Sequence, residues 1–62
     1  MGAKLQKAFD MAKEAGGLQV QMRLAMKSGM SADKAASVPD SPDIIQKMEA
    51  AFKEVVGKDI KL

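Results

Sequence analysis

The side chains able to carry chemistry in this chain of 62 residues are serine, lysine, arginine, aspartate and glutamate. Cysteine and histidine are absent, which excludes thiolate nucleophiles, disulfides, zinc–cysteine sites and the usual general base near neutral pH. No histidine is therefore present to activate the four serines, which are Ser28, Ser31, Ser37 and Ser41. We expect no enzymatic activity, no cofactor and no metal site.

Two carboxylates, Asp40 and Asp43, flank Ser41 in a spacing that faintly resembles a calcium-binding loop. The segment lacks the length, the central glycine and the terminal bidentate glutamate that such a loop requires. Aspartate and serine beside proline are typical of turns and of helix starts. The pattern predicts a turn and helix capping at this point instead of a cation site.

Three methionines recur every four residues, at Met22, Met26 and Met30. Met22 and Met26 line one edge of a helix, and Met30 can continue that edge through the following turn. Methionine is flexible and polarizable, so exposed methionines suit adaptable binding of a partner helix. The alternative is that they fill gaps in a core that has only 13 Leu, Ile, Val and Phe residues to draw on. We take these three methionines as the candidate partner surface.

Apolar residues recur with a helical period along most of the chain, and no strand pattern competes. The glycine pair at 16–17 and Gly29 each end a helix, because glycine adopts the left-handed conformation without cost. Ser41 followed by Pro42 and Asp43 is the clearest helix start. We expect helices near residues 3–15, 18–28, 32–37 and 42–56 in one all-α domain over residues 1–62, a small bundle of three to four, or five, short helices. The tail, residues 58–62, either packs Ile60 or frays.

The helical periods also predict which side chains form the core. The predicted core residues are Leu5, Phe9, Leu24, Ile45, Met48, Phe52 and Val55. Residues 18–28 are apolar on two sides, so this helix should lie centrally and touch two neighbours. A chain of this length buries little surface and has no disulfide, so self-association would add stability.

The spacing Gln21-x-x-x-Ala25-x-x-x-Gly29-x-Ser31 resembles the helix-turn-helix signature of lambda/Cro-type repressors. In that motif a small residue lets two helices approach, a glycine takes the left-handed turn, and a capping residue starts the second helix. The resemblance covers Gln21 to Val38. It implies an αα-corner whose second helix enters the major groove of DNA.

The positions that would face DNA differ from those of a base-reading helix. Residues 31–37 hold no Arg, Asn or Gln, the side chains suited to bidentate base contacts. The candidate nucleic-acid contacts are Arg23, Lys27, Ser31, Lys34 and Ser37. A net charge of +2 over the whole chain is a weak electrostatic footprint for a DNA binder.

These observations favour a small, basic, methionine-rich helical protein that acts as a protein–protein interaction module or homo-oligomer. The alternative is a DNA-binding helix-turn-helix protein that acts in transcriptional regulation. The longest apolar runs are far shorter than the roughly 20 residues that a membrane-spanning helix needs. We therefore expect a soluble, cytoplasmic protein without a membrane partner.

Overall fold

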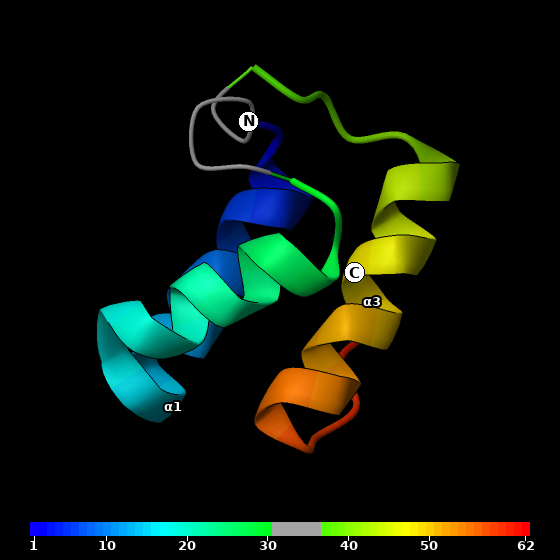
Figure 1. The fold of residues 1–62 in the computed structure, drawn as a ribbon. Coiled ribbons are helices and arrows are strands. Elements are labelled where there is room, and N and C mark those ends of the chain that lie inside the picture. Colours follow the sequence, from blue (N-terminus) through cyan, green and yellow to red (C-terminus); the bar gives the residue numbers. More distant parts are fainter. Residues whose placement is uncertain (31–36) are drawn as a thin grey trace.

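The computed structural model describes residues 1–30 and 37–62. All the regular secondary structure in these residues is α-helical. Helix α1 spans Ala3–Lys27 and helix α3 spans Pro42–Val56; the two pack against each other, and the described residues hold no strand (Figure 1). The all-α class predicted from the sequence is confirmed. A bundle of three to five helices is not supported, because the described residues form two. The helix expected near residues 32–37 lies, except for Ser37, outside them.

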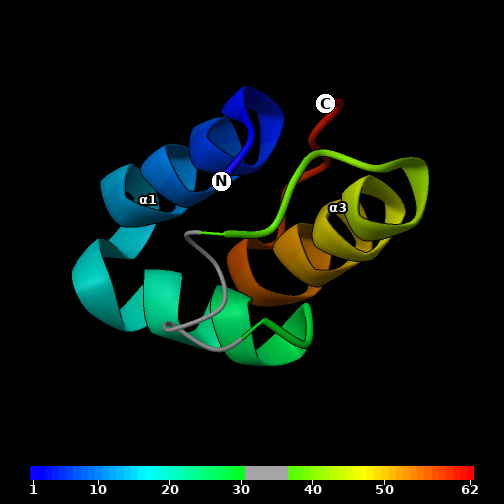
Figure 2. The same cartoon turned by 90° about the horizontal axis from the view of Figure 1, so that it is seen from above.

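A break at Gly16 and Gly17 divides α1 into a first segment, residues 3–15, and a second segment, residues 18–27. Gly17 has φ 79° and ψ −163°, a backbone conformation that only glycine adopts readily. The second segment folds back beside the first (Figure 1, Figure 2). The side chain of Gln21 joins them, because its Nε2 donates to the carbonyl oxygen of Phe9 at 2.9 Å. The glycine pair thus turns the chain at the position that the sequence predicts. The turn lies inside helix α1 instead of separating two helices.

Helix α3 begins and ends where the sequence predicts. Ser41 is its N-cap and accepts a 3.5 Å hydrogen bond from the backbone N–H of Ile44, while Pro42 occupies the first turn. Gly57 follows the last turn at φ 84°, and its N–H donates to the carbonyl oxygen of Lys53. Both ends depend on a capping serine or a glycine next to the helix, and such residues can be recognised in the sequence alone.

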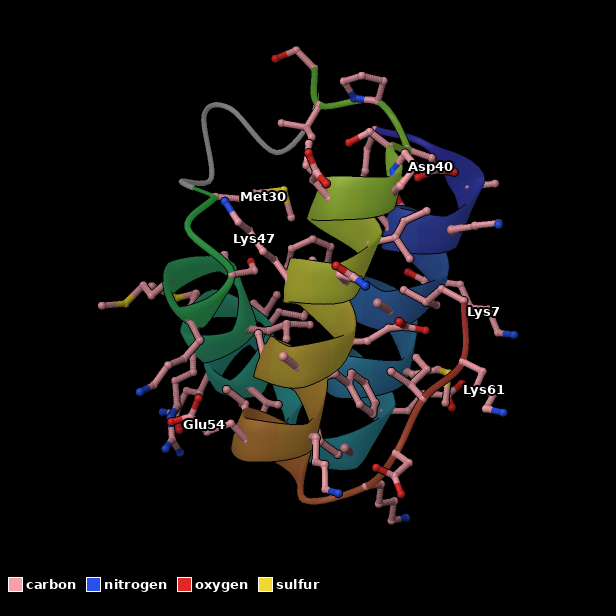
Figure 3. All side chains as sticks on the ribbon, turned by 90° about the vertical axis from the view of Figure 1, so that its right-hand side faces the viewer. Lys7, Met30, Asp40, Lys47, Glu54 and Lys61 are labelled. Atoms are coloured by element: carbon pink, nitrogen blue, oxygen red, sulfur yellow. The ribbon has the colours of Figure 1, made fainter. Side chains whose placement is uncertain are left out.

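Asp40 lies beside the N-terminus of α1 (Figure 3). Its carboxylate accepts hydrogen bonds from the backbone N–H groups of Lys4, at 3.1 Å, and Leu5, at 3.3 Å. Capping in this part of the chain is predicted from the sequence, and Ser41 caps α3 accordingly; the additional cap by Asp40 is on α1, a helix far away in the sequence.

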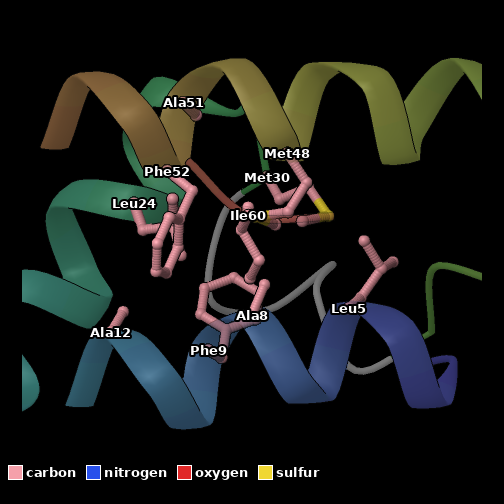
Figure 4. Packing of buried hydrophobic residues seen from close by; sticks show 10 residues of the cluster. All are labelled: Leu5, Ala8, Phe9, Ala12, Leu24, Met30, Met48, Ala51, Phe52 and Ile60. Carbon is pink, nitrogen blue, oxygen red and sulfur yellow. The ribbon is translucent and has the colours of Figure 1, made fainter. Parts of the chain in front are cut away.

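The core lies between α3 and both segments of α1, and the C-terminal tail closes it (Figure 4). The buried apolar residues are Leu5, Ala8, Phe9, Ala12, Leu24, Met30, Met48, Ala51, Phe52 and Ile60. All but two of the predicted core residues are among them. The exceptions, Ile45 and Val55, are only partly buried; in the terminal turns of α3 the residues that pack against the core are their neighbours Ile44 and Val56.

The C-terminal tail packs against the helices. Ile60 is buried in the core, and the backbone N–H of Leu62 donates to Glu49 Oε2 at 3.0 Å. Packing of Ile60, one of the two states left open by the sequence, is therefore the one observed.

Candidate protein-interaction surface

Three large apolar side chains are exposed along one side of the second segment of α1. The exposed fractions are 66% for Leu18, 65% for Met22 and 78% for Met26. Because these residues are spaced by four, they follow one another along one side of the helix and span about 12 Å of its axis. We call Leu18, Met22 and Met26 the exposed stripe.

The opposite side of the same segment faces the core. Leu24 is fully buried there, and Val20 and Ala25 pack against the core with partial burial. This helix touches two neighbours, as expected, because Gln21 bonds to the first segment of α1 and Lys27 pairs with Glu54 of α3, but the side that carries the exposed stripe is open. The first segment of α1 and α3 both lie on the Leu24 side (Figure 4).

Met30 does not continue the exposed stripe, although it stands four residues after Met26. Gly29, at φ 78°, reverses the chain: its N–H donates to the carbonyl oxygen of Met26 at 3.2 Å, and the N–H of Met30 donates to that of Ala25 at 2.9 Å. This pair of bonds is a Schellman motif, which turns the residue after the glycine back onto the helix. Met30 is consequently buried in the core. The structure brings Met22 and Met26 together and leaves Met30 out.

Leu18 is the member of the exposed stripe that the sequence analysis did not propose as a contact. It stands one turn before Met22, so the four-residue spacing that singles out the methionines extends to it. The four-residue spacing of large apolar residues of any type would have identified Leu18, whereas the spacing of methionines alone does not include it.

Positive charge borders the exposed stripe on one side. Gln19, Arg23 and Lys27 each follow a stripe residue by one position, and all three are exposed. Lys27 Nζ forms an ion pair with Glu54 Oε1 of α3 at 3.0 Å, with both side chains more than half exposed. A shallow depression of about 280 Å³, lined by Arg23, Met26 and Lys27, joins this border to the stripe.

The candidate nucleic-acid contacts are only partly described. Arg23 and Lys27 lie together on the second segment of α1, and Ser37 is exposed in a turn. The carboxylate of Glu54 offsets part of the charge of Lys27. Outside the described residues lie the two other candidates, Ser31 and Lys34. The described residues therefore present a basic patch of two cations, one of which already pairs with an acid.

Among residues 1–30 and 37–62, no three acidic side chains gather into a group that can hold a metal ion. Neither helix in this part of the chain is long and apolar enough to cross a membrane. No family model, curated protein or solved structure matches the chain.

Proposed function

We propose that this protein is a small cytoplasmic helical module that binds a partner protein through the exposed stripe. The supporting observation is that Leu18, Met22 and Met26 are all about two-thirds exposed or more on one side of α1. Large apolar side chains that cluster on a surface mark interaction sites, whereas scattered ones need no explanation. Methionine also adapts its shape to a partner, because its side chain is unbranched and polarizable.

Burial of the exposed stripe sets the strength of such an interaction. A large apolar side chain contributes roughly 1.5–3 kcal/mol when fully buried, so three contribute roughly 5–9 kcal/mol before the cost of association. Association costs at least about 4 kcal/mol in lost translational and rotational freedom. The stripe alone supports weak binding, and a tighter complex needs further contacts at its borders.

An α-helix is the partner shape that suits a straight stripe of this kind. Amphipathic helices bind through apolar anchors repeated every three or four residues, and the exposed stripe has the same spacing. A helix of another protein and a helix of a second copy of this chain both satisfy this geometry. A homo-oligomer is therefore one form of the same proposal.

DNA binding in transcriptional regulation is the alternative. The left-handed Gly29 and the exposed Arg23 and Lys27 favour it, since they fit the helix-turn-helix-like corner expected over Gln21–Val38. The ion pair of Lys27 with Glu54 weighs against it, because it reduces the positive charge of the basic patch, whereas DNA binding depends on contacts with several phosphates. We rank it second for that reason.

Sedimentation equilibrium at micromolar protein concentration, with and without duplex DNA, tests self-association against DNA binding. Self-association through the exposed stripe should disappear when Leu18, Met22 and Met26 are all replaced by glutamine. DNA binding should instead weaken steeply with salt, and Arg23→Gln with Lys27→Gln should flatten that dependence.

Partner binding is tested by selecting displayed helical peptides against the full chain. Peptides with an apolar stripe should be retained by the parent protein and lost with the triple glutamine variant. Equal retention of the peptides by both proteins would overturn the proposal. Salt-sensitive DNA binding that is unchanged in the triple glutamine variant would overturn it as well.

A further inference from the structure

The charged residues of the segment that carries the exposed stripe are all basic. Between Glu14 and Asp33 the sequence holds no carboxylate, while Arg23 and Lys27 stand within this interval. We infer that the partner of the exposed stripe is an acidic amphipathic helix whose carboxylates lie along the border that carries Arg23. This inference rests on the proposed function, because it names the partner's chemistry at the same surface.

The two borders of the exposed stripe differ in charge and in exposure. Gln19, Arg23 and Lys27 form the basic border, and all three are exposed. On the other border Gln21 and Ala25 are uncharged and half-buried. A partner helix therefore meets charge on one side only, which favours carboxylates along one edge of its own apolar side.

Arg23 is the residue of the basic border that is best placed to bind a carboxylate of the partner. Lys27 already pairs with Glu54 at 3.0 Å. Neither ion pair found among the described residues involves Arg23. A guanidinium also presents a planar fork of donors that matches a carboxylate with two parallel hydrogen bonds. A carboxylate of the partner would thus give Arg23 an ion pair that it does not form with the described residues of the free protein.

A second copy of this chain suits the exposed stripe less well than an acidic helix does. When two stripes pack antiparallel about a two-fold axis, both Arg23 side chains fall on the same edge of the interface. When they pack parallel, each Arg23 faces the uncharged border of Gln21 and Ala25. Neither arrangement brings a carboxylate of the second segment to Arg23, because that segment contains none.

A displayed library of helices of roughly 18 residues, about five turns, tests the inference. Each member carries leucine along one side, with Glu, Gln and Lys varied at both borders, and the library is selected against the full chain. Glu should be enriched over Lys by about tenfold on one border only. The Arg23→Glu variant should reverse that preference.

Lys7→Glu is the matched control, because it makes the same change of charge in the first segment of α1. Lys7 is exposed, and Figure 3 shows it on the opposite side of the view from Glu54. This variant should select the same acidic peptides as the parent protein. Loss of the preference in Lys7→Glu would mean that net charge alone causes it, which overturns the inference.

The remaining outcomes separate the inference from the proposed function. Peptides that depend on the exposed stripe but show no acidic bias overturn the acidic partner and leave the interaction module standing. No retained peptide, or equal retention by the triple glutamine variant, overturns the proposed function itself. Preference for phosphatidylcholine–phosphatidylserine vesicles over every displayed peptide contradicts both, because the stripe would then bind a lipid surface.

Discussion

The carboxylate of Asp40 caps helix α1 across 36 residues of sequence: its Oδ2 accepts a hydrogen bond from the backbone N–H of Lys4 at 3.1 Å. Its Oδ1 accepts a second one from Leu5 at 3.3 Å. The N-cap residue of α1 is Gly2, which has no side chain to do this, and the first turn holds no acid. Asp40 therefore supplies both the missing acceptor and the negative charge that a helix N-terminus favours.

Loss of this remote cap should weaken the fold measurably. Asp40→Ala should lower the free energy of unfolding by about 1 kcal/mol, the usual cost of a lost N-cap. Gly2→Ala should cost a similar amount, because a Cβ at Gly2 would overlap the Asp40 carboxylate and displace it. Since both changes act on one contact, the double variant should lose little more than either single variant. Urea denaturation followed by circular dichroism measures all three.

Asp59→Ala is the matched control for removal of an aspartate. Asp59 pairs with Lys53 at 3.2 Å, but both side chains are largely exposed, and such surface pairs contribute little. Its free energy of unfolding should stay within about 0.5 kcal/mol of the parent value. Fully additive losses in the variant that combines Gly2→Ala with Asp40→Ala would contradict the view that Gly2 makes room for the carboxylate.

Met26 and Met30, which the sequence places on one edge, should respond very differently to truncation. Met30→Ala should lower the free energy of unfolding by about 2–5 kcal/mol, because it leaves a cavity in the core. Met26→Ala removes an exposed side chain and should change it by no more than about 0.5 kcal/mol. Thermal denaturation of the two variants checks this difference. Equal losses would show that the Schellman turn at Gly29 does not bury Met30.

Gly17→Ala should destabilise the protein through its backbone. The conformation at Gly17, φ 79° and ψ −163°, costs an L-residue about 1–3 kcal/mol, although a Cβ there would meet no atom within 4 Å. D-alanine at the same position has the mirror-image preferences, so a chain synthesised with it should recover most of the loss. Equal destabilisation by L- and D-alanine in urea denaturation would refute a backbone origin.

The ends of the helices were predictable because each depends on a few neighbouring residues. Ser41 and Gly57 bound α3 as expected, and Gly17 turns the chain within α1. Contacts between distant residues carry no local signature. The capping of Lys4 by Asp40 and the burial of Ile60 both follow from how the chain closes on itself, which helical periodicity does not encode.

The candidate surface was predictable only in part for the same reason. Leu24 and Met22 stand on two apolar sides of one helix. The sequence predicts that Leu24 is in the core, but it leaves open whether Met22 binds a partner or fills the core as well. The position of α3 decides it, because α3 and the first segment of α1 cover Leu24 and leave Met22 open. For Met30, the sequence predicts the helix stop at Gly29, but the turn there reverses the chain, so the four-residue spacing does not place Met30 beside Met26.

Phe52→Ala should cause the largest loss of stability among single truncations to alanine. Phe52 is only 2% exposed and lies in the core between α3 and α1 (Figure 4). Removing a buried phenylalanine costs about 3–5 kcal/mol, and a domain this small without disulfides has little more than that in total. The variant should be largely unfolded at room temperature by circular dichroism, whereas Ala50→Ser, on the exposed side of α3, should melt within a few degrees of the parent. A Phe52→Ala protein that melts like the parent would contradict a core centred on this residue.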